Sequence, residues 1–500
     1  MQLPVADQEG RRFAVLRVFS HYVSARLLLL VLLEGMMLSL AVRWGCSLYP
    51  VSSPATVASN ADVMSAAIVF PAVMLFVMNG IGLYEPELFK NWRSIAARLF
   101  VAAVAGLAIT CALMLFIDQA YPQLQGVLAG AMAGLAGSCL VRWLFSRWSA
   151  VATFRPRVVV LGNGSGAAKI AQLAQREHSH EVVGCIDCGP PEEGRVALPR
   201  LLPAAGETLA EVAEKYGIDH IVIAVKDRRR AGLPVRDLLE CRLRGVRVSD
   251  LSTFFEREHR QVLLESLTPS WMVFGEGFRQ GLTRAIVKRF FDIAASFALL
   301  LVTLPVMLLT AACIAVESGR PILYRQQRIG QGGRPFTIYK FRSMRVGAES
   351  DGRPRWAGAN DDRTTRVGRF IRKTRIDELP QIFNVLKGEM TFVGPRPERP
   401  YFVDKLVEQV PYYALRHSVK PGITGWAQVR YPYGASVEDA IEKLQYDLYY
   451  VKNHTLFLDL VILAATVEVV LWGSGSGASP VAVQPRDEAG APLATPGAGV

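Results

Sequence analysis

Residues 293–316 read IAASFALLLVTLPVMLLTAACIAV, a continuous apolar run of 24 residues in the second half of the chain. A helix needs about 20 apolar residues to cross the hydrocarbon core of a bilayer, so this run is long enough to enter a membrane. Basic residues flank it on both sides: Arg284, Lys288 and Arg289 precede it, and Arg320, Arg325, Arg328 and Arg334 follow it. A single crossing would carry one basic cluster to the outside, which opposes the positive-inside bias.

Pro305 lies in the middle of this run. Proline removes a backbone donor and clashes with the preceding helical turn, so it can break a helix and turn the chain back. We therefore expect a re-entrant membrane helix over residues 286–316 that breaks at Pro305 and keeps both of its ends in the cytoplasm. The alternative is an ordinary membrane span.

The whole chain has the composition of a membrane protein with several domains. Its 500 residues are 51% hydrophobic and only 20% charged, and its mean hydropathy is +0.24. This is too apolar for an ordinary soluble chain, and too long for a single domain. The seven cysteines are scattered and indicate no secreted disulfide framework, which suits a reducing cytosol for the soluble parts.

Four apolar stretches in residues 1–150 predict an N-terminal bundle of four membrane-spanning helices. They cover residues 25–42, 63–83, 99–118 and 124–145. Basic residues precede the first stretch, separate the second from the third and follow the fourth, whereas the other two linkers carry only Arg43. By the positive-inside bias, the N-terminus and the residues just after 150 are cytoplasmic. A cleaved signal peptide is the alternative for the first stretch, although no clear small-residue cleavage site follows it.

Residues 151–275 have the pattern of a Rossmann-like α/β domain. Three apolar runs are typical of buried strands, namely RVVVLG (157–162), EVVGCID (181–187) and IDHIVIAV (218–225). They alternate with helix-like segments over 166–177, 206–216 and 233–244. This alternation predicts βαβ units and a parallel sheet.

The first of these strands runs into a glycine turn formed by Gly162, Gly164 and Ala167. Such a turn lets a backbone approach a pyrophosphate at a helix N-terminus, and Asp187 ends the next strand. A glycine turn of this kind is also common as a purely structural feature. The sequence therefore leaves open whether this domain binds a nucleotide.

Residues 320–376 carry most of the positive charge of the protein. They hold 15 Lys or Arg residues against 4 Asp or Glu residues, an excess of 11, while the whole chain has a net charge of +12. Next to a membrane helix, such a segment can bind anionic lipid head groups or a phosphorylated substrate. Nucleic acid is not expected as a partner, because no nucleic-acid-binding motif is visible.

The segment TRIDELPQIFNVLKGEM (374–390) places apolar residues at helical spacing, with Pro380 in the first turn and Gly388 as a stop. Asp377 and Glu378 are then adjacent acids at a helix N-terminus, in a basic neighbourhood. One interpretation is a charge bias that complements the helix dipole. The other is that two acids in a basic, membrane-proximal groove bind Mg²⁺ and attack phosphorus, as phosphoryl transfer from a nucleotide requires.

Four ordered motifs give the C-terminal region a specific resemblance. They are RQQRIGQGGRPFTIYKFRSM (325–344), DELPQIFNVLKGEM (377–390), FVGPRPE (392–398) and KPGITGWAQ (420–428). Over about residues 284–472 the chain resembles the bacterial sugar transferases, the monotopic-type phosphoglycosyl transferases. The resemblance implies an α/β catalytic domain with a re-entrant helix, which moves a sugar 1-phosphate from a UDP-sugar to polyprenyl (undecaprenyl) phosphate. It also implies the initiating step of exopolysaccharide or related glycan synthesis, at the cytoplasmic face of the bacterial inner membrane.

The resemblance implies roles for individual residues as well. Asp377 would be the nucleophile that forms an aspartyl phosphosugar, and Glu378 would bind Mg²⁺ together with Asp377. Four basic residues would surround the phosphates: Arg372 and Arg396 as phosphate grips that suit a forked guanidinium, and Lys340 and Arg342 in the same region. After GWAQ the chain departs from many relatives and reads VRYPYGAS (429–436), so a preference for a sugar or a nucleotide does not carry over.

Two alternatives from other classes find little support in the residues. A membrane-bound nucleotide-sugar dehydratase or epimerase needs a Tyr-x-x-x-Lys pair, and the only such spacing, Tyr401 to Lys405, lies far along the chain from Gly162. A non-catalytic polysaccharide assembly protein has no need for an acid pair together with Arg396. Residues 473–500 are rich in Gly, Ala and Pro and predict a disordered tail. The sugar, the polymer and association into homo-oligomers are left open.

Overall fold

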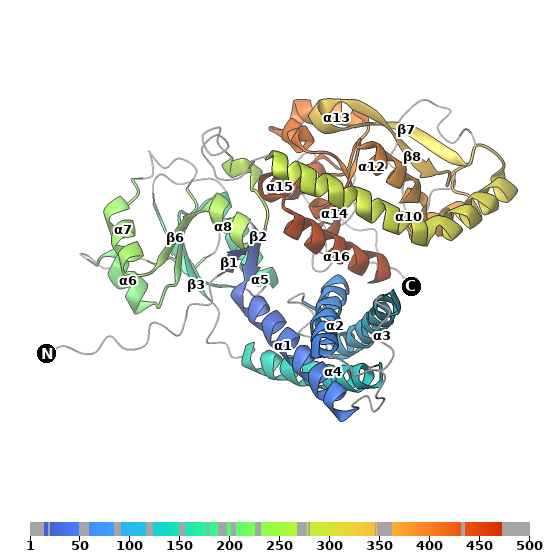
Figure 1. Cartoon of the computed structure of the whole chain (residues 1–500). Helices are drawn as coiled ribbons and strands as arrows, with labels where there is room; N and C mark the ends of the chain where they lie inside the picture. Colours follow the sequence, from blue (N-terminus) through green and yellow to red (C-terminus); the bar gives the residue numbers. More distant parts are fainter. Residues whose placement is uncertain are drawn as a thin grey trace, which may run out of the picture.

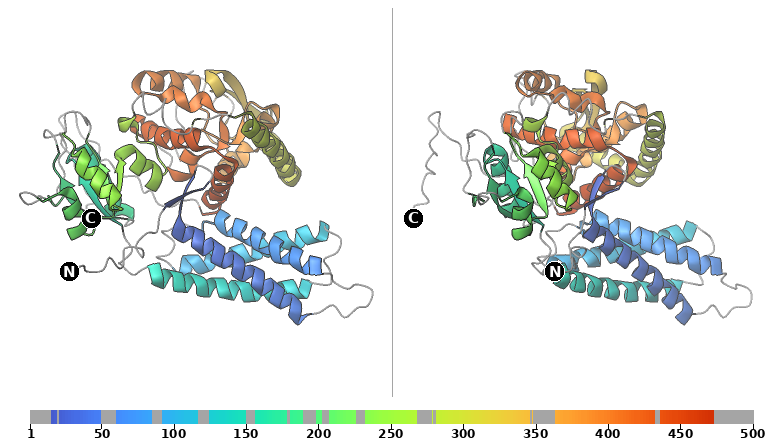
Figure 2. Two further views of the ribbon diagram at one scale, coloured as in Figure 1. Left: turned by 60° about the vertical axis from the view of Figure 1, so that its left-hand side comes forward. Right: turned by 90° about the vertical axis from the view of Figure 1, so that its left-hand side faces the viewer.

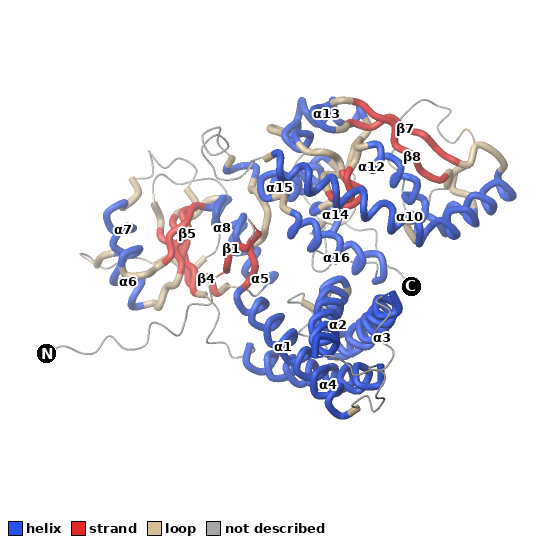
Figure 3. Tube along the Cα trace, viewed as in Figure 1, coloured by secondary structure: helices blue, strands red, loops and turns tan. Residues whose placement is uncertain are grey.

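Three regions follow one another along the chain: a helical N-terminal region, a parallel sheet with its helices, and a C-terminal α/β domain (Figure 1). In Figure 3 the largest sheet lies in the middle region, and the C-terminal domain is mostly helical. The expected tail over 473–500 lies outside the described residues. The computed structural model describes residues 15–18, 21–49, 60–84, 92–116, 124–149, 156–177, 180–188, 198–201, 207–225, 232–267, 278, 281–345, 347, 363–431 and 436–472.

Four helices make up most of the N-terminal region and lie side by side in both views of Figure 2. A short antiparallel hairpin, β1 (Val15–Val18) and β2 (His21–Ser24), precedes them. Each predicted apolar stretch coincides with a helix: α1 (Ala25–Leu48), α2 (Asn60–Gly80), α3 (Trp92–Phe116) and α4 (Leu124–Ser149). The described parts of α1 and α4 are long and apolar enough to cross a membrane, and those of α2 and α3 hold shorter apolar helices.

A buried ion pair joins α1 to α4. Arg142 and Glu34 are both fully buried, and Nε of Arg142 lies 2.7 Å from Oε1 of Glu34. Arg142 Nη1 also donates to the carbonyl oxygen of Leu83 at 2.6 Å, and the hydroxyl of Tyr84 donates to Glu34 at 2.6 Å. Charged side chains within an apolar bundle are tolerated when they are paired in this way. The network therefore fixes the register of α1, α4 and the turn that follows α2.

A four-stranded parallel sheet with the order β4-β3-β5-β6 forms the middle region. Its first three strands and helices coincide with the predicted ones: β3 (Arg157–Leu161), β4 (Glu181–Ile186), β5 (His220–Ile223), α5 (Ser165–Glu177), α6 (Leu209–Lys215) and α7 (Val235–Leu243). The strand β6 (Arg247–Asp250) and the following helix α8 (Leu251–Glu258) were not predicted from the sequence. The strand β6 lies at the edge of the sheet and is only half-buried, so its sequence RVSD shows no apolar run.

The C-terminal domain contains two small sheets and a set of packed helices. The strands β7 (Leu323–Ile329) and β8 (Pro335–Phe341) form an antiparallel hairpin, and β9 (Thr391–Val393) pairs in parallel with β10 (Gly422–Thr424). The helices after α10 are α11 (Arg366–Lys373), α12 (Ile382–Lys387), α13 (Pro400–Gln409), α14 (Trp426–Arg430), α15 (Val437–Asn453) and α16 (Leu456–Trp472). The second half of α15 is buried in the core of this domain.

The apolar run belongs to one long helix, α10 (Leu282–Ser318), which continues through Pro305. Pro305 therefore lies inside a continuous helix, and the expected re-entrant break at this residue stays a prediction. A proline inside a helix removes one hydrogen bond, and the two halves can stay helical on either side of a bend. Figure 1 shows α10 bending along its length.

Both ends of α10 are hydrogen-bonded to the C-terminal domain. Near its start, Asp292 accepts hydrogen bonds from the Thr391 hydroxyl and from the backbone nitrogen of Phe392, which belong to β9. At its end, Arg342 donates to the carbonyl oxygens of Ser318 and Gly319, both at 2.7 Å. Between these points the helix exposes a wide apolar face, since Leu301, Val302 and Val316 are 79%, 74% and 89% exposed.

Helix α16 lies between the C-terminal domain and the N-terminal helices. Asp459 of α16 is buried and pairs with Lys288 of α10 at 2.6 Å, and it accepts a hydrogen bond from Tyr450 at 2.7 Å. On another side α16 lies beside α2, where Gly80 faces Ala464 (Figure 1). The helix therefore joins α10 to the N-terminal helical region.

Candidate active site

The acid pair Asp377 and Glu378 lies on a 3₁₀ helix, η7 (Ile376–Gln381), that leads into α12. Arg375 has a φ of 60°, and this left-handed residue turns the chain from α11 into η7. The sequence predicted one helix over this segment, but Pro380 has no N–H to extend an α-helical ladder across it. Gly388, with a φ of 84°, ends α12 as predicted.

Glu378 is the centre of a buried charge cluster. Its Oε1 accepts hydrogen bonds from Nζ of Lys340 and from Nη2 of Arg396, both at 2.8 Å. Its Oε2 lies 3.7 Å from Nη1 of Arg375. Burial alone would raise the pKa of Glu378, but the charges of Arg396, Lys340 and Arg375 outweigh it and hold the pKa well below its usual value. Glu378 is therefore ionised and fixed in position.

Asp377 differs from Glu378 both in its hydrogen-bonding partners and in the direction of its pKa shift. Within the described part of the chain, no residue donates a hydrogen bond to its half-buried carboxylate. Burial raises the pKa of Asp377, the charge of Glu378 adds to this, and Lys340, Arg375 and Arg396 act in the opposite direction. An acid with a raised pKa and an unoccupied carboxylate is available for reaction, whereas Glu378 is already bound on one oxygen.

The structure brings some of the predicted basic residues to this pair and leaves others apart. Lys340 from β8 and Arg396 from the turn after β9 both reach Glu378. Arg372 lies in the last turn of α11, five residues before Asp377, and its side chain has no hydrogen-bonding partner among the residues described. Arg342 is buried and directs its hydrogen bonds to the end of α10. It therefore positions this helix, a role that the sequence did not suggest.

The glycine turn of the middle region has a structural explanation. Gly162 has a φ of 103°, and a Cβ at this position would lie 2.8 Å from the side chain of Val225. Gly164 leads into α5, and Ala167 is fully buried in the core beside the sheet. Chain conformation and the contact with Val225, just after β5, therefore require a glycine at position 162, and this turn is separate from the Asp377 cluster.

Three residues that matter for the acid pair were not among the predicted site residues. Arg375 pairs with Glu378, and Arg416 pairs with Asp447 behind the turn that carries Arg396. Arg416 lies four residues before the KPGITGWAQ motif, and its closeness to that motif is the only sequence signal for it. Nothing in the sequence pattern marked Asp447, because other polar residues, Gln445, Lys452 and Asn453, lie beside it on the same helix.

The acid pair offers a partial site for a hard divalent cation. Asp377 has its carboxylate oxygens available, and Glu378 has Oε2 without a close hydrogen bond. The part of the chain described contains no cluster of three or more His, Cys, Asp or Glu residues that could hold a metal by itself. Mg²⁺ commonly binds one or two carboxylates, with substrate phosphates and waters as its other ligands. These residues fit such a shared site.

Comparison with known proteins gives one family and several relatives. The family model described as bacterial sugar transferase matches residues 283–473. The chain is 41% identical to the UDP-N-acetylgalactosamine-undecaprenyl-phosphate N-acetylgalactosaminephosphotransferase of Aeromonas hydrophila, over 52% of this chain and 60% of that protein. It is 36% identical to the UDP-glucose:undecaprenyl-phosphate glucose-1-phosphate transferase of Klebsiella pneumoniae, over 52% of this chain and 56% of that protein. The chain thus spans less than two thirds of these two relatives.

A shorter relative is covered almost completely. The uncharacterized sugar transferase EpsL of Bacillus subtilis (strain 168) is 44% identical over 194 residues, which are 38% of this chain and 90% of that protein.

We expect Glu378→Gln to destabilise the protein at neutral pH by about 2 kcal/mol, since it removes a charged hydrogen-bond acceptor from Lys340 and Arg396. Because the folded pKa of Glu378 is depressed, its ionised form stabilises the fold above the unfolded value of about 4.5, and this contribution is lost as the pH falls. Thermal unfolding of wild type and variant in detergent should differ at pH 7, and the difference should begin to narrow below about pH 4.5.

The matched control is Glu240→Gln, which removes an exposed surface pair with Arg244 and should change the midpoint little. A difference between wild type and Glu378→Gln that stays constant from pH 7 to pH 4 would contradict the charge assignment.

Proposed function

This chain belongs to the bacterial sugar transferase family, and we propose that it transfers a sugar 1-phosphate from a UDP-sugar to undecaprenyl phosphate. The product would begin the synthesis of an exopolysaccharide or a related glycan. The observation that carries the proposal is the asymmetry of the acid pair: Glu378 is bound by Lys340 and Arg396, while Asp377 is available. The two longer relatives are named for different UDP-sugars, and both are named for undecaprenyl phosphate.

In the proposed reaction, Asp377 is the nucleophile. A carboxylate oxygen of Asp377 attacks the phosphorus that bears the sugar, the bond from this phosphorus to the bridging oxygen breaks, and UMP leaves with the electron pair. An oxygen of the polyprenyl phosphate then attacks the same phosphorus, and the Asp377 carboxylate is released. The raised pKa of Asp377 supports this role, since a more basic carboxylate is a better nucleophile once it is ionised.

The basic residues supply the electrostatic part of the reaction. Arg396 and Lys340 are fixed by Glu378 and lie close to Asp377, so their charges can stabilise the phosphate oxygens during transfer. Arg372, with no protein partner among the described residues, is free to grip a phosphate in a bidentate manner. We assign Mg²⁺ to Asp377 and Glu378, where it would neutralise charge on the diphosphate.

The proposed membrane arrangement is supported by the contacts of α10. Because both ends of α10 are hydrogen-bonded to one domain, a helix that crossed the bilayer would have to take part of that domain with it. We propose that α10 enters the inner membrane from the cytoplasm and returns, with its exposed apolar face in lipid. Glu317 supports this geometry, since it accepts hydrogen bonds from the backbone nitrogens of Arg366 and Val367 at the start of α11.

The domain division that we propose keeps the catalytic unit at the C-terminal end. Residues 1–150 would form four membrane spans, residues 151–275 a Rossmann-like domain, and residues 284–472 the catalytic domain on the cytoplasmic face. The dehydratase alternative is disfavoured by position, because Tyr401 and Lys405 lie on α13 and pair with each other by a cation–π contact of 4.5 Å.

Asp377→Asn should abolish turnover and leave the fold intact, because an amide of the same shape is not a nucleophile. Incubation of wild type with a radiolabelled UDP-sugar, without acceptor, should trap a covalent phosphosugar and release UMP. Appreciable turnover by Asp377→Asn, or no adduct under single-turnover conditions, would contradict the assignment of Asp377.

Removal of divalent cations should stop the reaction, because the acid pair and the substrate diphosphate would lose their shared cation. Activity should vanish in EDTA, return with Mg²⁺ and return at least in part with Mn²⁺. Zn²⁺ should not be needed. Full activity in excess EDTA would refute the metal proposal and leave the nucleophile untouched.

Cysteine labelling should report both ends of α10 as cytoplasmic. In a cysteine-free background, a membrane-impermeant thiol reagent applied to intact cells should miss Arg284→Cys and Arg334→Cys, and should reach Ser53→Cys in the linker predicted to lie outside. External labelling of Arg334→Cys would mean that α10 spans the membrane.

A further inference from the structure

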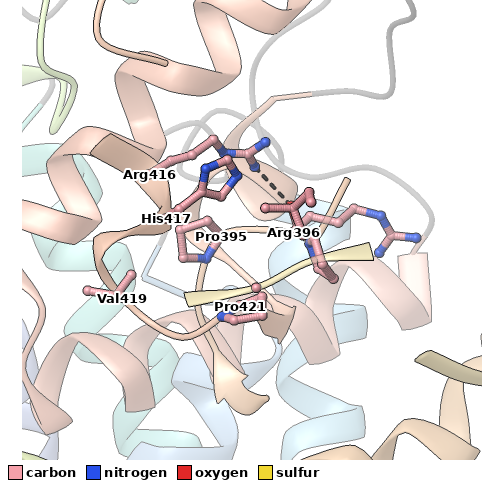
Figure 4. Close-up of a pocket in the computed structure, with 9 residues that line it drawn as sticks. Pro395, Arg396, Arg416, His417, Val419 and Pro421 are labelled. Carbon is pink, nitrogen blue, oxygen red and sulfur yellow. Dashed lines mark hydrogen bonds between the residues drawn. The ribbon is translucent and has the colours of Figure 1, made fainter. Parts of the chain in front are cut away.

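Arg396 is carried by a turn that its neighbours hold through backbone hydrogen bonds. Its residues run Gly394-Pro395-Arg396-Pro397, so a proline lies on each side of Arg396. The carbonyl oxygen of Pro395 accepts from the backbone nitrogen of Gly422 at 3.0 Å, and that of Pro397 accepts from Nη1 of Arg328 at 3.0 Å. The carbonyl oxygen of Arg396 accepts from Nη2 of Arg416 at 3.0 Å (Figure 4).

Arg416 itself forms a buried ion pair with Asp447. Its Nη2 lies 2.7 Å from Oδ2 of Asp447 on α15, and the two side chains are only 7% and 2% exposed. Its Nη1 donates to the hydroxyl of Tyr413 at 2.7 Å. A lysine could not make these contacts together, because only the planar guanidinium presents several donors in a fixed fork. The position of Arg416 is thus set by the core of the domain.

Side chains from the following segment also pack beside the turn. A small pocket lies against it, lined by Pro395 and Arg396 on the turn and by Arg416, His417 and Pro421 from the following segment (Figure 4). Pro395 and Pro397 are buried, so packing and the hydrogen bond from Arg416 together restrain the turn that carries Arg396.

We infer that Arg416, anchored by Asp447, is a positioning residue for Arg396: it fixes the backbone of the turn and so aims the Arg396 guanidinium at Glu378 and the donor diphosphate. This inference rests on the proposed function. The chain of groups runs from Asp447 through Arg416 and the carbonyl of Arg396 to the guanidinium that lies 2.8 Å from Glu378. A small displacement of a group that binds the transition state is costly, because its electrostatic effect depends on exact placement.

A double-mutant cycle tests this inference on the full-length, detergent-solubilised chain. Arg416→Lys keeps the positive charge beside Asp447 but loses the fork, and Arg396→Lys loses the forked phosphate grip. With UDP-glucose or UDP-N-acetylgalactosamine as donor, whichever the wild type uses, each single variant should lower kcat/KM by about tenfold or more and raise the donor KM. Because both changes remove one function, the double variant should be no worse than Arg396→Lys alone.

Two further variants separate positioning from loss of fold. Asp447→Asn removes the charge that holds Arg416 in place. If Arg416→Lys does not fold, Asp447→Asn replaces it in the double-mutant cycle with Arg396→Lys. Glu256→Gln is the control. It breaks another buried ion pair of α15, in which Lys452 lies 2.7 Å from Glu256, and this pair does not include Arg416. It should lower the thermal midpoint and leave the donor KM unchanged.

The outcomes distinguish this inference from the function on which it rests. If the losses of Arg416→Lys and Arg396→Lys multiply in the double variant, or if Arg416→Lys leaves the donor KM unchanged, Arg416 only stabilises the fold and the inference is refuted. If the wild type transfers sugar phosphate to undecaprenyl phosphate from no member of a wider panel of UDP-sugars, the proposed function is at fault.

Discussion

The buried carboxylate of Glu378 is the interaction on which the candidate site depends. It joins three separate pieces of chain, because Lys340 comes from the β7–β8 hairpin, Glu378 from η7 and Arg396 from the turn after β9. A buried carboxylate has to be compensated by positive partners, and two cations close together need a shared negative charge. Each member therefore holds the others in place. The positive charges of Lys340 and Arg396 are therefore held beside Asp377, whose carboxylate stays available.

The second constraint is the position of α10, because one face of this helix packs on the C-terminal domain and another face needs an apolar environment. One stripe of the helix binds the domain through Asp292, Ser296, Met307, Thr310 and Ile314, which are buried. Much of the remaining surface between residues 293 and 316 is apolar and exposed, and contact of such an area with water is unfavourable unless lipid covers it. The helix packs on the elements that carry the acid pair, since Met307 and Ile314 share a core cluster with Ile376 and Leu379 of η7. This arrangement couples the depth of α10 in a membrane to the place of Asp377.

The middle region is tied to the C-terminal domain through α15. Glu256 of α8 is buried and binds both Lys452 and Asn453, and the Trp426 indole donates to the carbonyl oxygen of Arg260 at 2.9 Å. Trp426 belongs to the GWAQ motif, so this motif of the C-terminal domain has a partner in the middle region. The glycine turn, by contrast, is explained by packing within its own sheet.

What the sequence determined by itself was the kind and order of the elements. Apolar runs of sufficient length predicted the four N-terminal helices and α10, alternation predicted β3 to α7, and the ordered motifs placed Asp377 and Glu378 in the C-terminal domain. These signals are local, since they depend on the periodicity or length of one segment. The tertiary structure decided the rest: that α10 continues through Pro305, that Arg342 binds the end of α10, and that Arg416 and Asp447 stand behind Arg396. Ion pairs and hydrogen bonds of this kind join residues from different elements, and a charge in the sequence looks the same whether it faces solvent or another charge. Only the packing of the elements determines which partner a charged residue has, and the burial of the pair determines how strong their interaction is.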